Sequence, residues 1–143
     1  MSKIRYAEVP RNYPLCVKAD CPMADHCLRQ IAMGEISKHD NVMTIVNPLR
    51  TKPSEQCESY RSNELQTFAR GFTKMQEVML PRQYKTFMLQ LQSHFGRTAY
   101  FERRRGERLC SPRDIKVIEA VLQSLGLPRL EFDAYEQHLC WTE

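Results

Sequence analysis

The chain contains 143 residues, of which 42% are hydrophobic and 27% charged, and its mean hydropathy is −0.54. These values are typical of one ordinary globular domain. No uninterrupted apolar run exceeds three residues, which excludes a membrane-spanning helix, since such a helix needs about 20 apolar residues. The N-terminal sequence MSKIRYAEVPRNYP lacks the apolar stretch of a secretory signal, so we expect a cytoplasmic protein in a reducing compartment, with no membrane partner. The net charge of +4 is uneven, because the middle of the chain is basic and its C-terminal part is acidic.

The first third of the chain predicts one short helix and one strand. Pro22 suits the first position of a helix, apolar residues follow it at helical spacing, and Gly34 is expected to end that helix. Residues 42–46 (VMTIV) are rich in β-branched side chains and precede an Asn-Pro pair, which predicts a single strand.

Two helices are predicted next, joined by a sharp turn. From Leu65 to Met79, apolar residues recur at i, i+3, i+4 and i+7, the spacing of an amphipathic helix. A second helix is expected to begin at Pro81 and to end at Phe95, directly before Gly96.

The last third predicts a β-hairpin followed by two helices. Residues 98–110 surround Gly106, which supplies the positive φ that a tight turn needs. Ser111 and Pro112 then provide an N-cap and a first helical position. A terminal helix is expected to begin near Asp133, where DAYE resembles a capping box.

The sharpest chemical feature is a set of four cysteines, Cys16, Cys21, Cys27 and Cys57, in the pattern C-x4-C-x5-C-x29-C. Four thiolates complete a tetrahedral zinc site or hold an iron–sulfur cluster, and both suit a reducing compartment. Two other interpretations stay open: small buried hydrophobic residues, and disulfide or redox chemistry.

The spacing of the thiols bears on which metal they hold. If a helix begins at Pro22, Cys21 and Cys27 lie roughly 9 Å apart along its axis, which is a long distance for two ligands of one ion. This favours an iron–sulfur cluster slightly over zinc. Cys110 and Cys140 have no nearby cysteine in the sequence, and we predict that they lie in the core.

Arginines flank aromatic residues around the predicted hairpin, and they are the candidate nucleic-acid contacts. These candidates are Arg97, Arg103, Arg104, Arg105, Arg108 and Tyr100. Guanidinium groups contact phosphates and aromatic rings stack on bases, so the partner expected here is a nucleic acid or an acidic protein. The alternative is a solvated turn whose arginines are neutralised by Glu102, Glu107 or the acidic tail.

The sequence resembles a small bacterial family of uncharacterised proteins, known chiefly from Bacteroidales and grouped as a domain of unknown function. The segments that carry the resemblance are 13–16 (YPLC), 21–29 (CPMADHCLR), 46–48 (VNP), 57–61 (CESYR), 95–108 and 132–136 (FDAYE), with Trp141. The resemblance implies a single domain over the full chain. It implies no activity, ligand or metal.

The predicted fold is therefore a single α+β domain over residues 1–143 that is mainly helical. A Cys-rich metal-site region at 1–61 precedes a helical region at 62–143, with a β-hairpin at about 98–110. No nucleophile elbow, phosphate-binding glycine loop or His-Glu zinc motif is present, so we expect binding rather than turnover. The expected function is a metal-binding interaction or regulatory protein; the alternative is an iron–sulfur redox protein or enzyme subunit.

Overall fold

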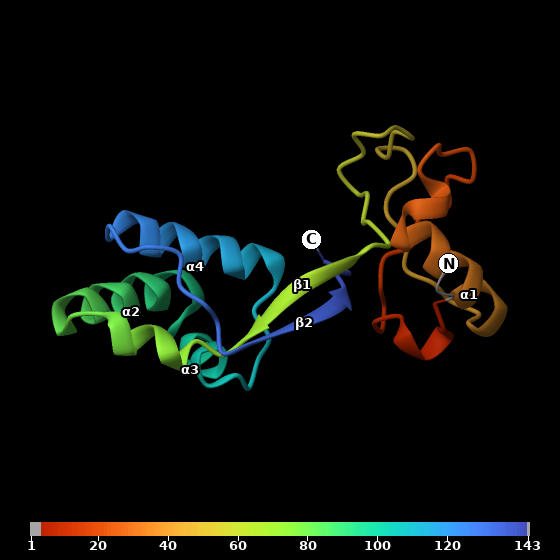
Figure 1. Ribbon diagram of the computed structural model, residues 1–143. Helices are drawn as coiled ribbons and strands as arrows, with labels where there is room; N and C mark the ends of the chain where they lie inside the picture. The colour runs from red at the N-terminus through yellow and green to blue at the C-terminus, as the bar shows by residue number, and fades with distance from the viewer. Residues whose placement is uncertain (1–3, 143) are drawn as a thin grey trace. The chain divides into compact units, whose positions relative to one another are not determined.

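The computed structural model describes residues 4–142, and the chain divides into two compact units (Figure 1). We call residues 1–64 with 139–143 the N-terminal unit, and residues 65–138 the central unit. The fold is α+β and mainly helical, and its described residues contain one two-stranded antiparallel sheet. No helix within residues 4–142 is long and apolar enough to cross a membrane.

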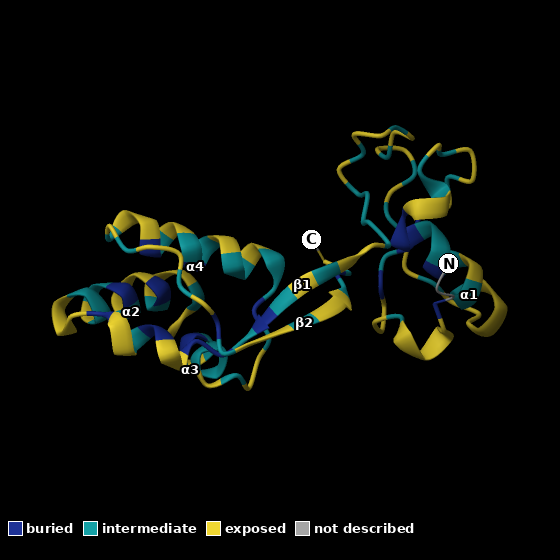
Figure 2. Cartoon of the chain, viewed as in Figure 1, coloured by how far each residue is buried: buried dark blue, intermediate teal, exposed yellow. Residues whose placement is uncertain are grey.

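The N-terminal unit is built around one helix, α1, which spans Leu28–His39. The prediction of a helix from Pro22 to Gly34 was wrong at both ends. Residues Ala24–His26 form a separate 3-10 helix, and Cys27 has an extended backbone that serves as the N-cap of α1. Gly34 lies inside α1 with no positive φ, so it does not end the helix. Figure 2 shows that the buried positions of α1 lie toward its N-terminal end.

The strand predicted at residues 42–46 does not form. Ile45 makes one isolated parallel bridge to Leu15, through hydrogen bonds from the Leu15 amide to the Thr44 carbonyl (2.9 Å) and from the Val46 amide to the Leu15 carbonyl (2.9 Å). A strand needs several consecutive residues paired with a neighbouring segment, and this single bridge pairs only one. The side chains of Val42 and Ile45 also stay exposed. The bridge nevertheless fixes the backbone directly before Cys16.

The sheet of the central unit pairs two segments that local sequence patterns assign to helices. Strand β1 spans Leu65–Arg70 and strand β2 spans Ala134–Leu139, so the predictions of a helix over 65–79 and of a terminal helix were wrong. After β1, Gly71 has a φ of +77°, and Thr73–Val78 form a 3-10 helix. The Asp133 carboxylate accepts hydrogen bonds from the Thr73 amide and hydroxyl (3.0 and 2.7 Å), so it caps this segment instead of its own.

Two of the predicted helices are present: α2 spans Pro81–Phe95 and α4 spans Pro112–Ser124. The Ser111 hydroxyl accepts a hydrogen bond from the Asp114 amide (3.2 Å), as the capping pattern predicts. The predicted hairpin at 98–110 is wrong, because Arg97–Arg105 form helix α3. Gly106, with a φ of +81°, terminates α3 in the left-handed conformation that follows many helices, so its positive φ serves a helix end and not a hairpin turn.

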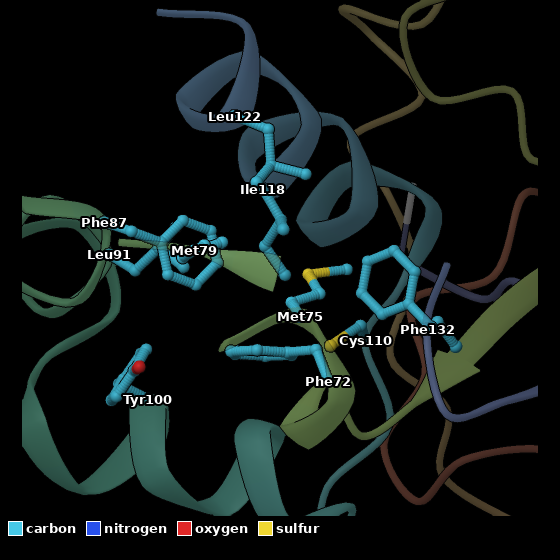
Figure 3. Close-up of a cluster of buried hydrophobic side chains, with 11 residues drawn as sticks. Phe72, Met75, Met79, Phe87, Leu91, Tyr100, Cys110, Ile118, Leu122 and Phe132 are labelled. Atoms are coloured by element: carbon cyan, nitrogen blue, oxygen red, sulfur yellow. The ribbon is translucent and has the colours of Figure 1, made fainter. Parts of the chain in front are cut away.

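The core of the central unit surrounds Phe72 (Figure 3). The Phe72 ring makes edge-to-face contacts with Phe87 (6.0 Å between ring centroids) and Phe132 (6.2 Å), and a tilted contact with Tyr100 (5.8 Å). Cys110 is completely buried in this core, and Cys140 is buried in the N-terminal unit. The burial predicted for these two cysteines is confirmed.

Candidate metal centre

The four candidate cysteines line one small cavity of the N-terminal unit. Cys16, Cys21, Cys27 and Cys57 all contribute to its wall, and its volume is about 10 Å³. All four are free thiols; Cys16 and Cys27 are buried, and Cys21 and Cys57 are half-buried. Within residues 4–142, no group of three or more His, Cys, Asp or Glu side chains is arranged as a metal site. The structure thus brings the four cysteines to one cavity without closing their sulfur atoms around a common point.

Backbone hydrogen bonds at the start of α1 gather the segments that carry these cysteines. The Leu28 amide donates to the Arg61 carbonyl (2.6 Å), and Cys27 forms an antiparallel bridge with Ser62. The Cys16 amide donates to the Arg29 carbonyl (3.3 Å). Segments on both sides of α1 in the sequence are therefore held against its first turn, and each of them carries a cysteine.

The Arg29 side chain joins the same two segments. Its Nε donates to the Ser59 carbonyl (2.6 Å), two residues after Cys57, and its Nη1 donates to the Pro14 carbonyl (2.8 Å), two residues before Cys16. The guanidinium lies over the Tyr13 ring, 5.1 Å from its centroid. One planar side chain thus sets the distance between two cysteine-bearing loops.

Gln30 orients one of the thiols directly. Its Nε2 donates to the Cys16 Sγ (3.3 Å) and to the Lys18 carbonyl (2.6 Å). Sequence reasoning missed both Gln30 and Arg29. Their signal was available, because Arg29 follows Cys27 by two residues and Gln30 by three, at the start of a helix where side chains face the neighbouring loops.

Most of the predicted nucleic-acid contacts are engaged within the central unit. Arg103 Nε and Asp114 lie 3.0 Å apart, and their side chains are only 13% and 15% exposed. Arg105 pairs with Glu107 (2.9 Å) at an exposed position. The remaining contacts are Arg108 with Glu102 (3.3 Å), Arg104 with the Gln76 side chain and the Tyr84 ring, and Arg97 over the Phe101 ring.

Tyr100, the aromatic member of this set, is completely buried in the core, so it presents no ring face for base stacking. The ion pairs match the alternative in which acidic neighbours neutralise the arginines. A contact of these arginines with nucleic acid or an acidic protein stays a prediction.

Comparison with known proteins gives one result. The model of a family of unknown function, DUF6078, matches residues 1–141, so the chain belongs to this family and the resemblance to a domain of unknown function is confirmed. No curated protein and no solved structure matches the chain. Function is therefore argued from the residues of the site.

Proposed function

We propose that this member of DUF6078 is a cytoplasmic interaction or regulatory protein whose Cys16, Cys21, Cys27 and Cys57 bind a single zinc ion as thiolates. One observation carries the proposal: four cysteines from separate segments line the same cavity. Neutral thiols have no mutual attraction that would gather them, whereas a divalent cation binds four thiolates at about 2.3 Å each.

The size of the cavity supports one ion rather than a cluster. A volume of about 10 Å³ holds about one water-sized sphere. A tetrahedral four-thiolate zinc site has no open coordination position, so it stabilises the fold and does no catalysis. We expect the N-terminal unit, held by this ion, to present a surface to a partner. We also propose that this protein comes from a bacterium of the Bacteroidales type, as the family resemblance implies.

The second candidate is an iron–sulfur cluster in a protein that carries electrons or senses oxidants. It is favoured by the fact that no three of the described thiols are arranged around one point. A cluster separates its thiolates further than a single ion does, so it tolerates that arrangement better.

Metal analysis after anaerobic purification tests the proposal. We expect a colourless protein with about one zinc per chain, as four-thiolate sites bind one ion. Iron and sulfide with broad visible absorption would establish the cluster instead. A chain without stoichiometric metal would refute both candidates.

Cysteine variants test the assignment of the ligands. Cys57→Ser is expected to lose most of the metal, because the serine hydroxyl is not deprotonated as a thiol ligand is. Cys110→Ala is the matched control, because Cys110 lies in the core of the central unit. Burial raises the pKa of the Cys110 thiol to about 12; the negative charge of Asp114 raises it further, and the positive charge of Arg103 lowers it by less. Cys110→Ala is expected to keep the full metal content. Equal metal in both variants would show that Cys57 is not a ligand.

A further inference from the structure

The cysteine cavity has a wall of one charge sign. Among the described residues that line it, the charged side chains are Lys18 and Arg29, and the wall contains no carboxylate and no imidazole. The thiols are therefore the groups at this cavity that can supply negative charge by becoming ligands. Several other arginines of the chain do have carboxylate partners, as the pairs of Arg103 with Asp114 and of Arg105 with Glu107 show.

Arg29 is a buried cation without a counter-ion. The residue is 9% exposed, and within residues 4–142 it forms no ion pair. Its guanidinium donates hydrogen bonds to the carbonyls of Ser59 and Pro14. Arg103 is similarly buried, but it pairs with Asp114. Burial of a charge is costly unless an opposite charge accompanies it. The groups that contact the Arg29 guanidinium are two backbone carbonyls and the Tyr13 ring, and none of them carries a negative charge.

We propose that Arg29, together with Lys18, is the counter-charge of a doubly negative tetrathiolate metal centre. Four thiolates around one divalent cation carry a net charge of −2, which the guanidinium and the ammonium neutralise. The inference rests on the proposed function, and it assigns Arg29 two roles: it positions the loops of Cys16 and Cys57 through its hydrogen bonds, and it balances the charge that appears when the metal binds.

The two roles predict different effects of two substitutions. Arg29→Met removes both the charge and the hydrogen bonds. Arg29→Lys keeps the charge but loses the planar guanidinium whose N–H groups reach two carbonyls at once. Arg11→Met is the matched control, because Arg11 is an exposed arginine of the same unit that does not line the cavity. Lys18→Met removes the second cation at a half-buried position that holds no other segment through its side chain.

The test measures the zinc affinity of the full chain by competition with a chelator of known affinity. Loss of a group that supports the ligands typically lowers metal affinity by about 10- to 100-fold, and we expect Arg29→Met to fall in this range. Arg29→Lys should recover most of that loss, Lys18→Met should lose several-fold, and Arg11→Met should match the wild type.

Each outcome supports or overturns the inference. Equal losses in Arg29→Met and Arg29→Lys, with wild-type affinity in Lys18→Met, would show that Arg29 acts through its hydrogen bonds alone and would overturn the charge role. If Arg29→Met does not fold, Lys18→Met decides, and an unchanged affinity there refutes the counter-charge. Tight zinc binding by every variant would refute the inference while the proposed function stands. Absence of zinc from the wild type would refute the proposed function itself.

Discussion

Removal of the proposed zinc ion is expected to unfold the N-terminal unit and to leave the central unit folded. The perturbation is addition of a strong chelator to the full chain. The two units have similar lengths but different cores. The large hydrophobic side chains buried in the described part of the N-terminal unit are Ile4, Tyr13, Leu15 and Leu28, and those of the central unit are Phe72, Met75, Met79, Phe87, Leu91, Tyr100, Ile118, Leu122 and Phe132.

The magnitude follows from this difference. Full burial of one large apolar side chain contributes about 1.5–3 kcal/mol, so the N-terminal unit lacks roughly 10 kcal/mol of the burial that stabilises the central unit. Structural zinc binding contributes about 10–16 kcal/mol to folding, which is enough to offset this deficit. Two further buried side chains of the N-terminal unit, Cys16 and Cys27, are proposed ligands, so metal loss also leaves a defect in its small core.

Hydrogen–deuterium exchange with mass spectrometry measures the two units separately. After chelation, amides of α1 should exchange about 100-fold faster or more, which corresponds to a loss of about 2.7 kcal/mol in local stability. Amides of α2 and α4 should exchange at their original rates. Cys57→Ser without chelator should reproduce this pattern, and Cys110→Ala should not.

Continued protection of α1, after metal analysis has verified that the metal is gone, would contradict this prediction. The N-terminal unit would then fold through its own contacts, and the four thiols would have no role in stability. Loss of protection in both units together would also refute it, because the core of the central unit does not depend on the cysteines.

Two further predictions concern the central unit. Gly71→Ala should lower the free energy of unfolding of this unit by about 1–2 kcal/mol more than Gly126→Ala does. Both glycines have a positive φ, but only at Gly71 would the added Cβ lie 2.7 Å from the Asp133 carboxylate. Equal losses for the two variants in urea denaturation would contradict this. Tyr100→Phe should raise the free energy of unfolding by about 1 kcal/mol and with it the melting temperature. The reason is that the buried Tyr100 hydroxyl has no hydrogen-bond partner in good geometry among the described residues. Burial raises the pKa of Tyr100, and Tyr84, which lies beside this hydroxyl, helps to raise it, so a lower melting temperature of the variant would show a hydrogen bond between the two tyrosines and would contradict the prediction.

Local sequence signals predicted the elements whose ends they mark. Helices α2 and α4 begin at Pro81 and Pro112, where proline is preorganised for the first helical turn, and α4 also has its Ser111 cap. These signals act within a few residues, so they need no knowledge of the rest of the fold. The burial of Cys110 and Cys140 followed in the same way from their chemical character.

The same local signals predicted helices at β1 and β2, where pairing between distant segments forms strands instead. The apolar spacing that begins at Leu65 fits a helix, but the structure uses it as a strand, a turn at Gly71 and a 3-10 helix. Asp133 has the pattern of a cap for its own segment, yet its carboxylate caps the segment at Thr73. The spacing of apolar residues within one segment does not show which distant segment will pair with it as a strand.

The sequence by itself identified the candidate metal ligands: four cysteines grouped by type and spacing in a basic chain. Only the tertiary structure decided that their side chains line one cavity and that Arg29 is buried there without a carboxylate. The physical reason is that side-chain chemistry is local, whereas burial and the pairing of charges depend on segments that meet only when the chain folds.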